Sequence, residues 1–330
     1  MTINCRRLGA GQLLVMLALA AIATMSSSLH AQTFPQRPVR IIVPFPPGGG
    51  QDITTRTIGK YVSDAWGQAV IVDNRAGGKT LIGADAAARA APDGHTLLMV
   101  SVEVLINTGL LAPALVNMQR DLAPVILCST GVTVLAVRAG SPIKSLSELT
   151  SQARANPGKL SYGSAGIGSS THMTAEQLVL MAKIDLLHVP YKGTAASIAD
   201  AVGGKIDMVF AGAPPLLALF QSGKLRPLAV GSRKRFPLLP DTPTFDESGL
   251  PGFEMSTFAG LMAPAKTPSA IIGQINKDMG VVLQRKEVMD SMLAGGTVAM
   301  GGTPEDMAAF IKERGAVLKR LIEVANIQTD

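Results

Sequence analysis

Two glycine-rich segments of this chain have the composition of anion-binding loops. Residues 44–50 read Pro-Phe-Pro-Pro-Gly-Gly-Gly, and residues 164–168 read Ser-Ala-Gly-Ile-Gly. Each segment follows an apolar run and precedes a helical pattern, so its end lies beside backbone amides that have no partner within the helix. Because neither segment contains Lys or Arg, neutral donors would hold the anion, which suits a small carboxylate better than a triphosphate. An ordinary turn is the alternative for each segment taken alone.

Arrangements typical of enzymes are incomplete in this sequence. Ser141 and Lys144 form a Ser-x-x-Lys pair, but no Ser-Asp-Asn accompanies it, and Ser164 lacks the spacing of a nucleophile elbow. Residues 78–80, Gly-Lys-Thr, resemble the end of a phosphate-binding loop, but Asp73 stands where its first glycine is needed. An exported hydrolase that uses Ser141 or Ser164 is therefore the alternative to a binding protein.

The histidines and cysteines indicate no metal site. His95, His172 and His188 follow residue 31 without a His-Glu-x-x-His pattern, and Cys128 has no partner cysteine after that residue. The apolar neighbours of Cys128 predict a buried thiol with a structural role. His172 lies in the first turn of the helix after the second segment, where it could contact a ligand or bond to the nearby backbone. We expect no metal and no cofactor.

The composition indicates a folded protein that does not bind nucleic acid. The chain has 330 residues, of which 47% are hydrophobic and 16% charged, enough for a sizeable core and for two domains. The net charge is only +6, aromatic residues make up 4%, and residues 233–235 are the one short basic cluster. A nucleic-acid groove needs more clustered cations and stacking rings.

The N-terminal segment has the three parts of an export signal. Arg6 and Arg7 precede an apolar run over residues 13–25, and a stretch rich in small residues ends at Ala31. The run is shorter than the ~20 residues of a spanning helix. We expect cleavage of residues 1–31, after Ala31, and a soluble periplasmic protein.

Strand and helix patterns alternate twice along the rest of the chain, which predicts two α/β layers with parallel strands. The first series has strands at residues 39–43, 70–72 and 96–100, with helices at 52–66 and 82–90. The second has strands at residues 160–163, 186–189, 206–210 and 227–230, with helices after residue 169 and at 195–202 and 216–221. Beyond residue 253, two long amphipathic helices are expected, and the last begins at Thr303-Pro304.

Several motifs together resemble the Bug family, the extracytoplasmic solute receptors of tripartite tricarboxylate transporters. The similar segments are residues 37–50, 74–75, 91–94, 121–125, 164–168, 188–193, 239–244 and 263–264, with His172 and Glu176. They span nearly the whole chain after the export signal.

The resemblance implies an α/β, two-lobed periplasmic binding-protein fold of type II, each lobe a mostly parallel sheet flanked by helices. Residues 32–140 plus 255–330 are expected to form lobe one and residues 141–254 lobe two, with crossings near Ala139 and Glu254. The family closes on a small carboxylate and presents it to membrane permease subunits, and we expect a monomer. A ligand-sensing adaptor for a membrane sensor has the same binding chemistry and is a further alternative.

The family's ligand contacts carry over onto both glycine-rich segments of this sequence. They are Phe45, Gly48, Gly49, Gly50 and Asp52 from lobe one, and Ser164, Ala165, Ser169 and His172 from lobe two. Asp52 could instead cap its helix. The sequence departs from the family at Gln51, where a short hydroxyl is common, and at Lys79, which is expected to place a cation near the rim of the cleft. The identity of the carboxylate is therefore open.

Overall fold

A six-stranded sheet contains the strands from both ends of the chain. The computed structural model describes residues 34–111 and 115–325. The strand order is β11-β4-β10-β3-β1-β2. The strands are β1 (Val39–Val43), β2 (Val70–Asn74), β3 (Thr96–Val100), β4 (Leu122–Gly131), β10 (Thr257–Pro264) and β11 (Thr297–Gly301). The helices of the same chain segments are α2 (Gly50–Trp66), α3 (Leu81–Ala88), α4 (Val102–Ile106), α5 (Met118–Asp121), α10 (Ser269–Leu283), α11 (Lys286–Ala294) and α12 (Pro304–Val324), with the short turns η1 (Gly78–Thr80) and η2 (Asn107–Leu111).

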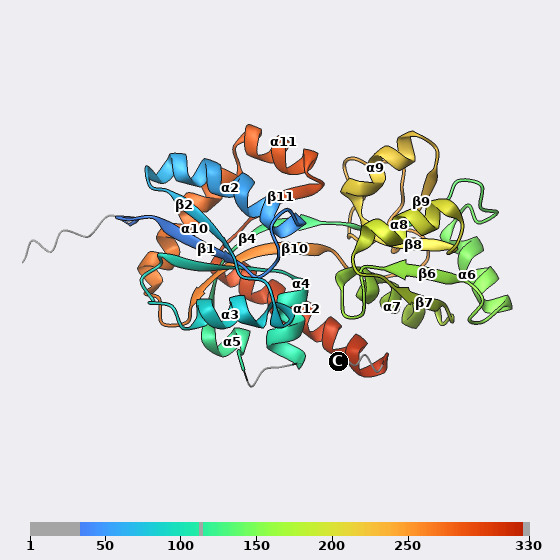
Figure 1. Cartoon of the computed structure of the whole chain (residues 1–330), viewed down its shortest axis with the longest axis horizontal. Coiled ribbons are helices and arrows are strands. Elements are labelled where there is room, and N and C mark those ends of the chain that lie inside the picture. The colour runs from blue at the N-terminus through green and yellow to red at the C-terminus, as the bar shows by residue number, and fades with distance from the viewer. Residues whose placement is uncertain (1–33, 112–114, 326–330) are drawn as a thin grey trace, which may run out of the picture. The chain divides into compact units, whose positions relative to one another are not determined.

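A five-stranded sheet is built from the middle of the chain. Its order is β7-β6-β8-β5-β9, and Figure 1 shows α6 to α9 gathered around it. The strands are β5 (Thr133–Arg138), β6 (Ser161–Ser164), β7 (Leu187–Pro190), β8 (Met208–Gly212) and β9 (Leu225–Val230). The helices are α6 (Leu146–Ala155), α7 (Ser170–Ala182), α8 (Thr194–Gly203) and α9 (Ala213–Gln221). The predicted alternation of strand and helix in two series is confirmed.

Both sheets are mixed, which corrects the prediction of mostly parallel sheets. Strand β1 pairs in parallel with β2 and β3, whereas β10 is antiparallel to β3 and β4, and β11 is antiparallel to β4. In the other sheet β6 is parallel to β7 and β8, but β5 is antiparallel to β8 and β9. The strand and helix pattern predicts only the strands joined by helical crossovers. Strands that enter a sheet without such a crossover are free to pair antiparallel.

The chain passes from the six-stranded to the five-stranded sheet at Val132. Strand β4 ends at Gly131 and β5 begins at Thr133, so Val132 alone separates strands of different sheets. Residues 133–138 therefore lie in the five-stranded sheet. Apolar residues continue through both strands, so the sequence does not mark the change.

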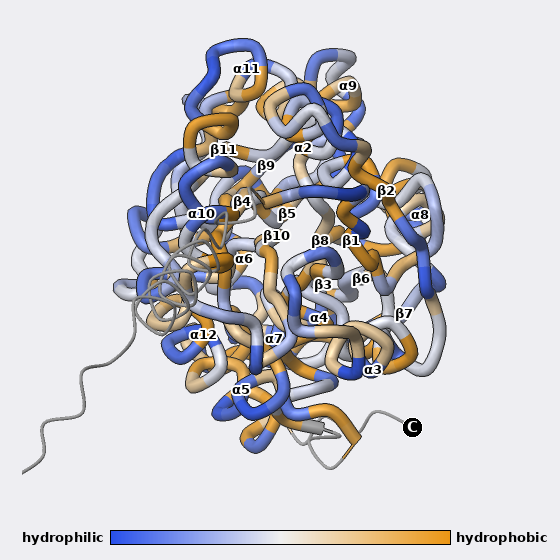
Figure 2. The backbone as a smooth tube through the Cα atoms, turned by 90° about the vertical axis from the view of Figure 1, so that its left-hand side faces the viewer, coloured by the Kyte–Doolittle hydropathy of each residue, from blue (hydrophilic) through white to orange (hydrophobic). Residues whose placement is uncertain are grey.

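Buried apolar side chains join the two sheets. Leu98 of β3 and Leu135 of β5 belong to one buried cluster, and Arg37 begins a single compact unit that includes both sheets. Figure 2 shows hydrophobic and hydrophilic stretches alternating along the chain, as such half-buried elements require. The N-terminal 36 residues count as a separate unit, of which only 34–36 are described, so the predicted export signal lies outside the described residues.

Two local predictions are confirmed by contacts. The Thr303 side chain accepts from the Asp306 amide while the Asp306 carboxylate accepts from the Thr303 amide, which is a capping box at the start of α12. Cys128 is fully buried, and desolvation raises the pKa of its thiol to about 12. Among the described residues, no helix is both long and apolar enough to span a bilayer.

Candidate functional site

A cavity of about 770 Å³ is lined by segments of both sheets and their helices. The start of α2 contributes Gly48, Gly49 and Gly50, and the starts of α7 and α8 contribute Ser170 and Thr194. The remaining lining is largely apolar or uncharged. It includes Phe45, Pro46, Pro47, Ile53, Val102, Val132, Gly212, Pro214, Pro215, Phe258, Met292 and Gly296. The cavity therefore brings the N-termini of α2, α7 and α8 to one space, together with those of α4 and α9.

The first glycine-rich loop leaves its amides free at the start of α2. Gly48 has φ +82°, a left-handed conformation that glycine adopts without strain, and its amide donates to Asp52 Oδ2 over 2.9 Å. The following amides of Gly49, Gly50 and Gln51 make no hydrogen bond within the described residues. Since these three residues line the cavity, the amides are available to an anion.

The buried side chain of Asp52 holds this loop through hydrogen bonds. It is 3% exposed, does not line the cavity, and accepts from Gly48, Arg56 and Asn74. The hydrogen bond from Arg56 is the main cause that lowers its pKa to about 2, and it outweighs desolvation. Of the two roles open to Asp52, the geometry supports the structural one, because the carboxylate is fully engaged with the loop and the helix.

The second glycine-rich loop satisfies most of its amides within itself. The Ala165 amide donates to Thr171 Oγ1 over 2.9 Å, and the Gly166 amide donates to Ser164 Oγ over 3.1 Å. The Gly168 amide donates to His172 Nδ1 over 3.2 Å. These donors are consumed by the fold and are not free for a ligand.

Its helix start is also occupied. Ser169 caps α7 by accepting the His172 amide, and the Ser170 amide donates to Glu103 Oε1 over 3.2 Å. Glu103 lies in α4, which follows β3 of the other sheet. Among the described residues that line the cavity, Glu103 is the one with a charged side chain.

A buried polar cluster supports the second loop. The His188 ring stacks on Tyr162 at 4.7 Å and on His172 at 4.2 Å, and His188 Nε2 lies 2.7 Å from Ser164 Oγ. Glu176 accepts from Tyr162 OH over 2.7 Å and lies 3.5 Å from His172 Nε2.

Burial and charge shift the pKa values of this cluster. Desolvation, followed by the neighbouring His172, lowers the pKa of His188 to about 4. Burial opposes ionisation of Glu176, but hydrogen bonds from His172 and Tyr162 outweigh it and lower the pKa of that carboxyl. The cluster is therefore built for a neutral His188.

Neither serine singled out for nucleophilic chemistry lies in a catalytic arrangement. Ser164 contacts His188, but its side chain is fully buried, and no carboxylate hydrogen bond to His188 is present in the described residues. Ser141 Oγ accepts the Ile143 amide in the turn before α6, and Glu148 accepts the Lys144 amide there. The Ser-x-x-Lys pair is thus part of a helix start.

The structure divides the expected ligand contacts into two groups. Phe45, Gly48, Gly49 and Gly50 line the cavity. The others, Asp52, Ser164, Ala165, Ser169 and His172, do not line it and instead hold the two loops. Lys79 is not among the lining residues either.

Sequence reasoning missed Glu103, Ser170 and Thr194. Glu103 follows β3 and Thr194 follows β7, so the rule that ligands bind beyond the carboxyl ends of parallel strands could have found both. Gly193, with φ 102°, precedes Thr194 and is the sequence signal of that turn.

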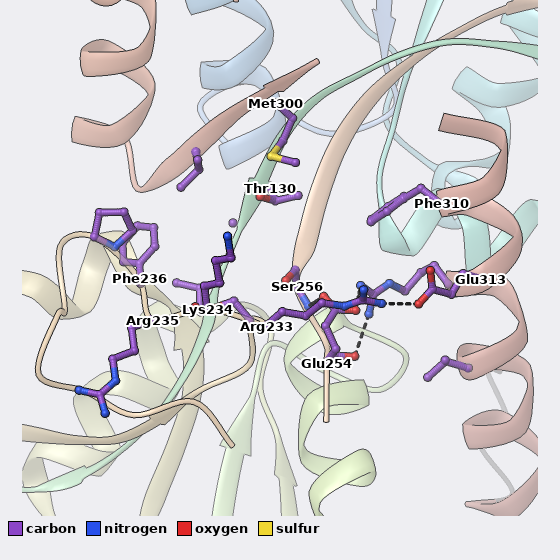
Figure 3. A pocket seen from close by; sticks show the side chains of 17 residues that line it. Thr130, Arg233, Lys234, Arg235, Phe236, Glu254, Ser256, Met300, Phe310 and Glu313 are labelled. Carbon is purple, nitrogen blue, oxygen red and sulfur yellow. Dashed lines mark hydrogen bonds and ion pairs between the residues drawn. The ribbon is translucent and has the colours of Figure 1, made fainter. Parts of the chain in front are cut away.

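A second cavity of about 530 Å³ lies between α12, β11 and the loop after β9 (Figure 3). Arg233 pairs with Glu313 and Arg235 with Glu247, so two of the three cations of the basic cluster are neutralised. No helix of eight residues or more begins among its described lining residues. The second cavity therefore offers charged side chains, whereas the first offers free amides at a helix start.

Comparisons with known proteins agree with this architecture. The structure of the periplasmic binding protein BugD superimposes with a TM-score of 0.74 at 30% identity, covering 90% of this chain and 100% of that one. Rpa4515 of R. palustris, solved with adipate, superimposes with a TM-score of 0.77 at 30% identity, covering 89% and 99%. Fold and site thus define a two-lobed α/β solute-binding protein.

The family follows from the sequence matches. Residues 54–327 match the family described as the tripartite tricarboxylate transporter family receptor, TctC. The protein BugT of Bordetella pertussis is 35% identical over 295 residues, which cover 89% of this chain and 90% of that protein. This chain belongs to the tripartite tricarboxylate transporter receptor family, whose members are solute-binding receptors, and the resemblance to Bug proteins is confirmed.

Proposed function

We propose that this chain is a periplasmic receptor that binds a small carboxylate and delivers it to the membrane permease of a tripartite transporter. The observation that carries the proposal is the set of free amides at Gly49, Gly50 and Gln51, three residues that line a cavity together with Thr194 at the start of α8. Family membership supports delivery to a permease, and the adipate in the Rpa4515 structure supports a carboxylate ligand.

The carboxylate would accept hydrogen bonds from the amides of α2 and gain from the helix dipole. Each net hydrogen bond contributes ~0.5 to 1.5 kcal/mol, and charged partners give ~1.5 to 3 kcal/mol. The second loop would contribute by positioning Ser170 and by accepting the Gly193 amide at Ala165 O, next to Thr194, and not through its own amides. Closure of two lobes would expel water and strengthen these bonds.

The lobe division follows sheet membership. Lobe one comprises the segments of the six-stranded sheet and lobe two those of the five-stranded sheet, with the first crossing at Val132 and the return between β9 and β10. An export signal over residues 1–31 is consistent with a periplasmic location.

A thermal-shift screen of small mono- and dicarboxylates tests the function. A ligand at a hundred times its Kd should stabilise the folded protein by about 2.7 kcal/mol, which is a clear rise in Tm. Native mass spectrometry of protein purified without refolding should show a retained small acid. If no small acid raises Tm and none is retained, the proposal fails.

A further inference from the structure

The position of Glu103 suggests what else the ligand carries. Its Oε2 accepts from Ser101 Oγ over 2.7 Å and its Oε1 accepts from the Ser170 amide over 3.2 Å. These two bonds fix the carboxylate of Glu103, a residue that lines the first cavity. A carboxylate has about four lone-pair sites, so a donor from a ligand can still bind.

Glu103 also places a negative charge at the start of α7. The start of α7 would otherwise attract an anion, but Glu103 already supplies the negative charge there. A second carboxylate on a ligand would meet a like charge at this end of the cavity. Within the described lining, no cationic side chain offsets that repulsion.

We propose that Glu103 makes this cavity select a carboxylate that carries an ammonium group over a dicarboxylate of the same length. The inference rests on the proposed function. The ligand carboxylate binds the free amides of α2, and its ammonium group binds Glu103. Glu103 is thus a specificity-determining residue.

Calorimetric titration with matched ligand pairs tests the proposal. The pairs are succinate against 3-aminopropanoate, glutarate against 4-aminobutanoate, and adipate against 5-aminopentanoate. Each is measured with the wild type, with Glu103→Gln, and with Glu313→Gln as the control, a carboxylate on the second cavity. Glutamine at 103 keeps an acceptor for the Ser170 amide and removes the charge.

The expected result has two parts. In the pair that binds best, the wild type prefers the amino acid at least about tenfold, and Glu103→Gln lowers that affinity about tenfold or more while strengthening the dicarboxylate. Glu313→Gln leaves the ratio unchanged.

Two other outcomes separate the hypotheses. If dicarboxylates bind the wild type more tightly and Glu103→Gln does not change the ratio, this inference is overturned while the proposed function stands. If no compound of the series binds any of the three proteins, this inference is overturned, and the proposed function is contradicted only if the thermal-shift screen and native mass spectrometry also find no small acid.

Discussion

The two glycine-rich loops resemble each other in sequence and use their amides differently. The N-cap residue of α2 is Gly49, which has no side chain to accept a hydrogen bond, so the next amides of this loop stay free. The loop before α7 is capped by the Ser169 side chain, and its amides bond to Ser164, Thr171 and His172.

The difference shows when a helix start is a ligand site. Amides that already have internal partners gain little from an anion, because the exchange of one bond for another is nearly neutral. The first loop has no hydroxyl in residues 44–50, and Asp52 satisfies only the Gly48 amide. The second loop has hydroxyls at Ser164, Ser169 and Thr171 that accept from its own amides and from the start of α7. We therefore expect it to position residues and not to bind the ligand through those amides.

The largest expected effect is on binding, from removal of one amide at each helix start. Gly50→Pro removes a free donor at a position that tolerates proline, since Gly49 has ψ 166° and a Cβ at residue 50 meets nothing within 4 Å. Titration with the best carboxylate from the screen should show a loss of about tenfold to a hundredfold.

The matched control is Ser170→Pro at the same position of α7. Ser169 has ψ 159°, which also accepts a following proline, and the lost amide is the one bonded to Glu103. We expect a smaller loss of affinity than for Gly50→Pro. Equal losses would show that the two loops bind alike.

The next effect concerns the stability of the first loop. Asp52→Ala removes the acceptor for the Gly48 amide and for Asn74 and should lower the free energy of unfolding by about 1 to 3 kcal/mol. Asp85→Ala, which removes an exposed ion pair with Arg89, should cost only ~0.3 to 0.5 kcal/mol. Urea denaturation measures both, and similar costs would deny Asp52 its anchoring role.

Acid should weaken the second loop through His188. Its folded pKa of about 4 lies below the ordinary 6.5, so the unfolded chain binds the additional proton between these values. Stability contributed by neutral His188 is therefore full above pH 6.5 and falls as pH is lowered towards 4. Allowing for solvent screening of this half-buried ring, we expect a loss of about 1 to 2 kcal/mol.

The measurement is Tm against pH for the wild type and for His188→Gln. Glutamine does not titrate, so this variant should show a shallower fall in Tm between pH 6.5 and 4. Parallel curves for the two proteins would assign the acid sensitivity to other groups.

The smallest effect tests the cap of the second loop. Ser169→Ala removes the acceptor for the His172 amide and should cost ~1 kcal/mol, whereas Ser169→Gly should cost only a few tenths. Chemical denaturation of both variants distinguishes them. If Ser169→Ala leaves the stability unchanged, the hydroxyl does not hold this loop.

Much of the fold was predictable because patterns among neighbouring residues predict its strands and helices. Periodicity, turns and caps located β1, β3, β6 and β8, and the Thr303 cap marked the start of α12. The antiparallel strands β4, β5 and β10 were not predicted as such, because pairing direction depends on segments far apart in the sequence.

The candidate site was predictable only in part. The glycines at 48, 49 and 50 announce a helix start with free amides, and they line the cavity. Thr194 was overlooked, although a strand and Gly193 precede it. Glu103 follows strand β3, a position that favours ligand contacts, but its contact with the Ser170 amide is visible only in the structure.

The sequence by itself determined the strands joined by helical crossovers, the starts of α2, α7 and α12 and the absence of cations from both glycine-rich segments, since these depend on neighbouring residues. Only the tertiary structure decided which of those helix starts keeps free donors. That outcome depends on side chains brought from distant segments, such as Glu103 at α7 and His188 at Ser164. Whether a backbone amide has a hydrogen-bond partner depends on which groups lie near it in the folded protein, and these can come from any part of the sequence.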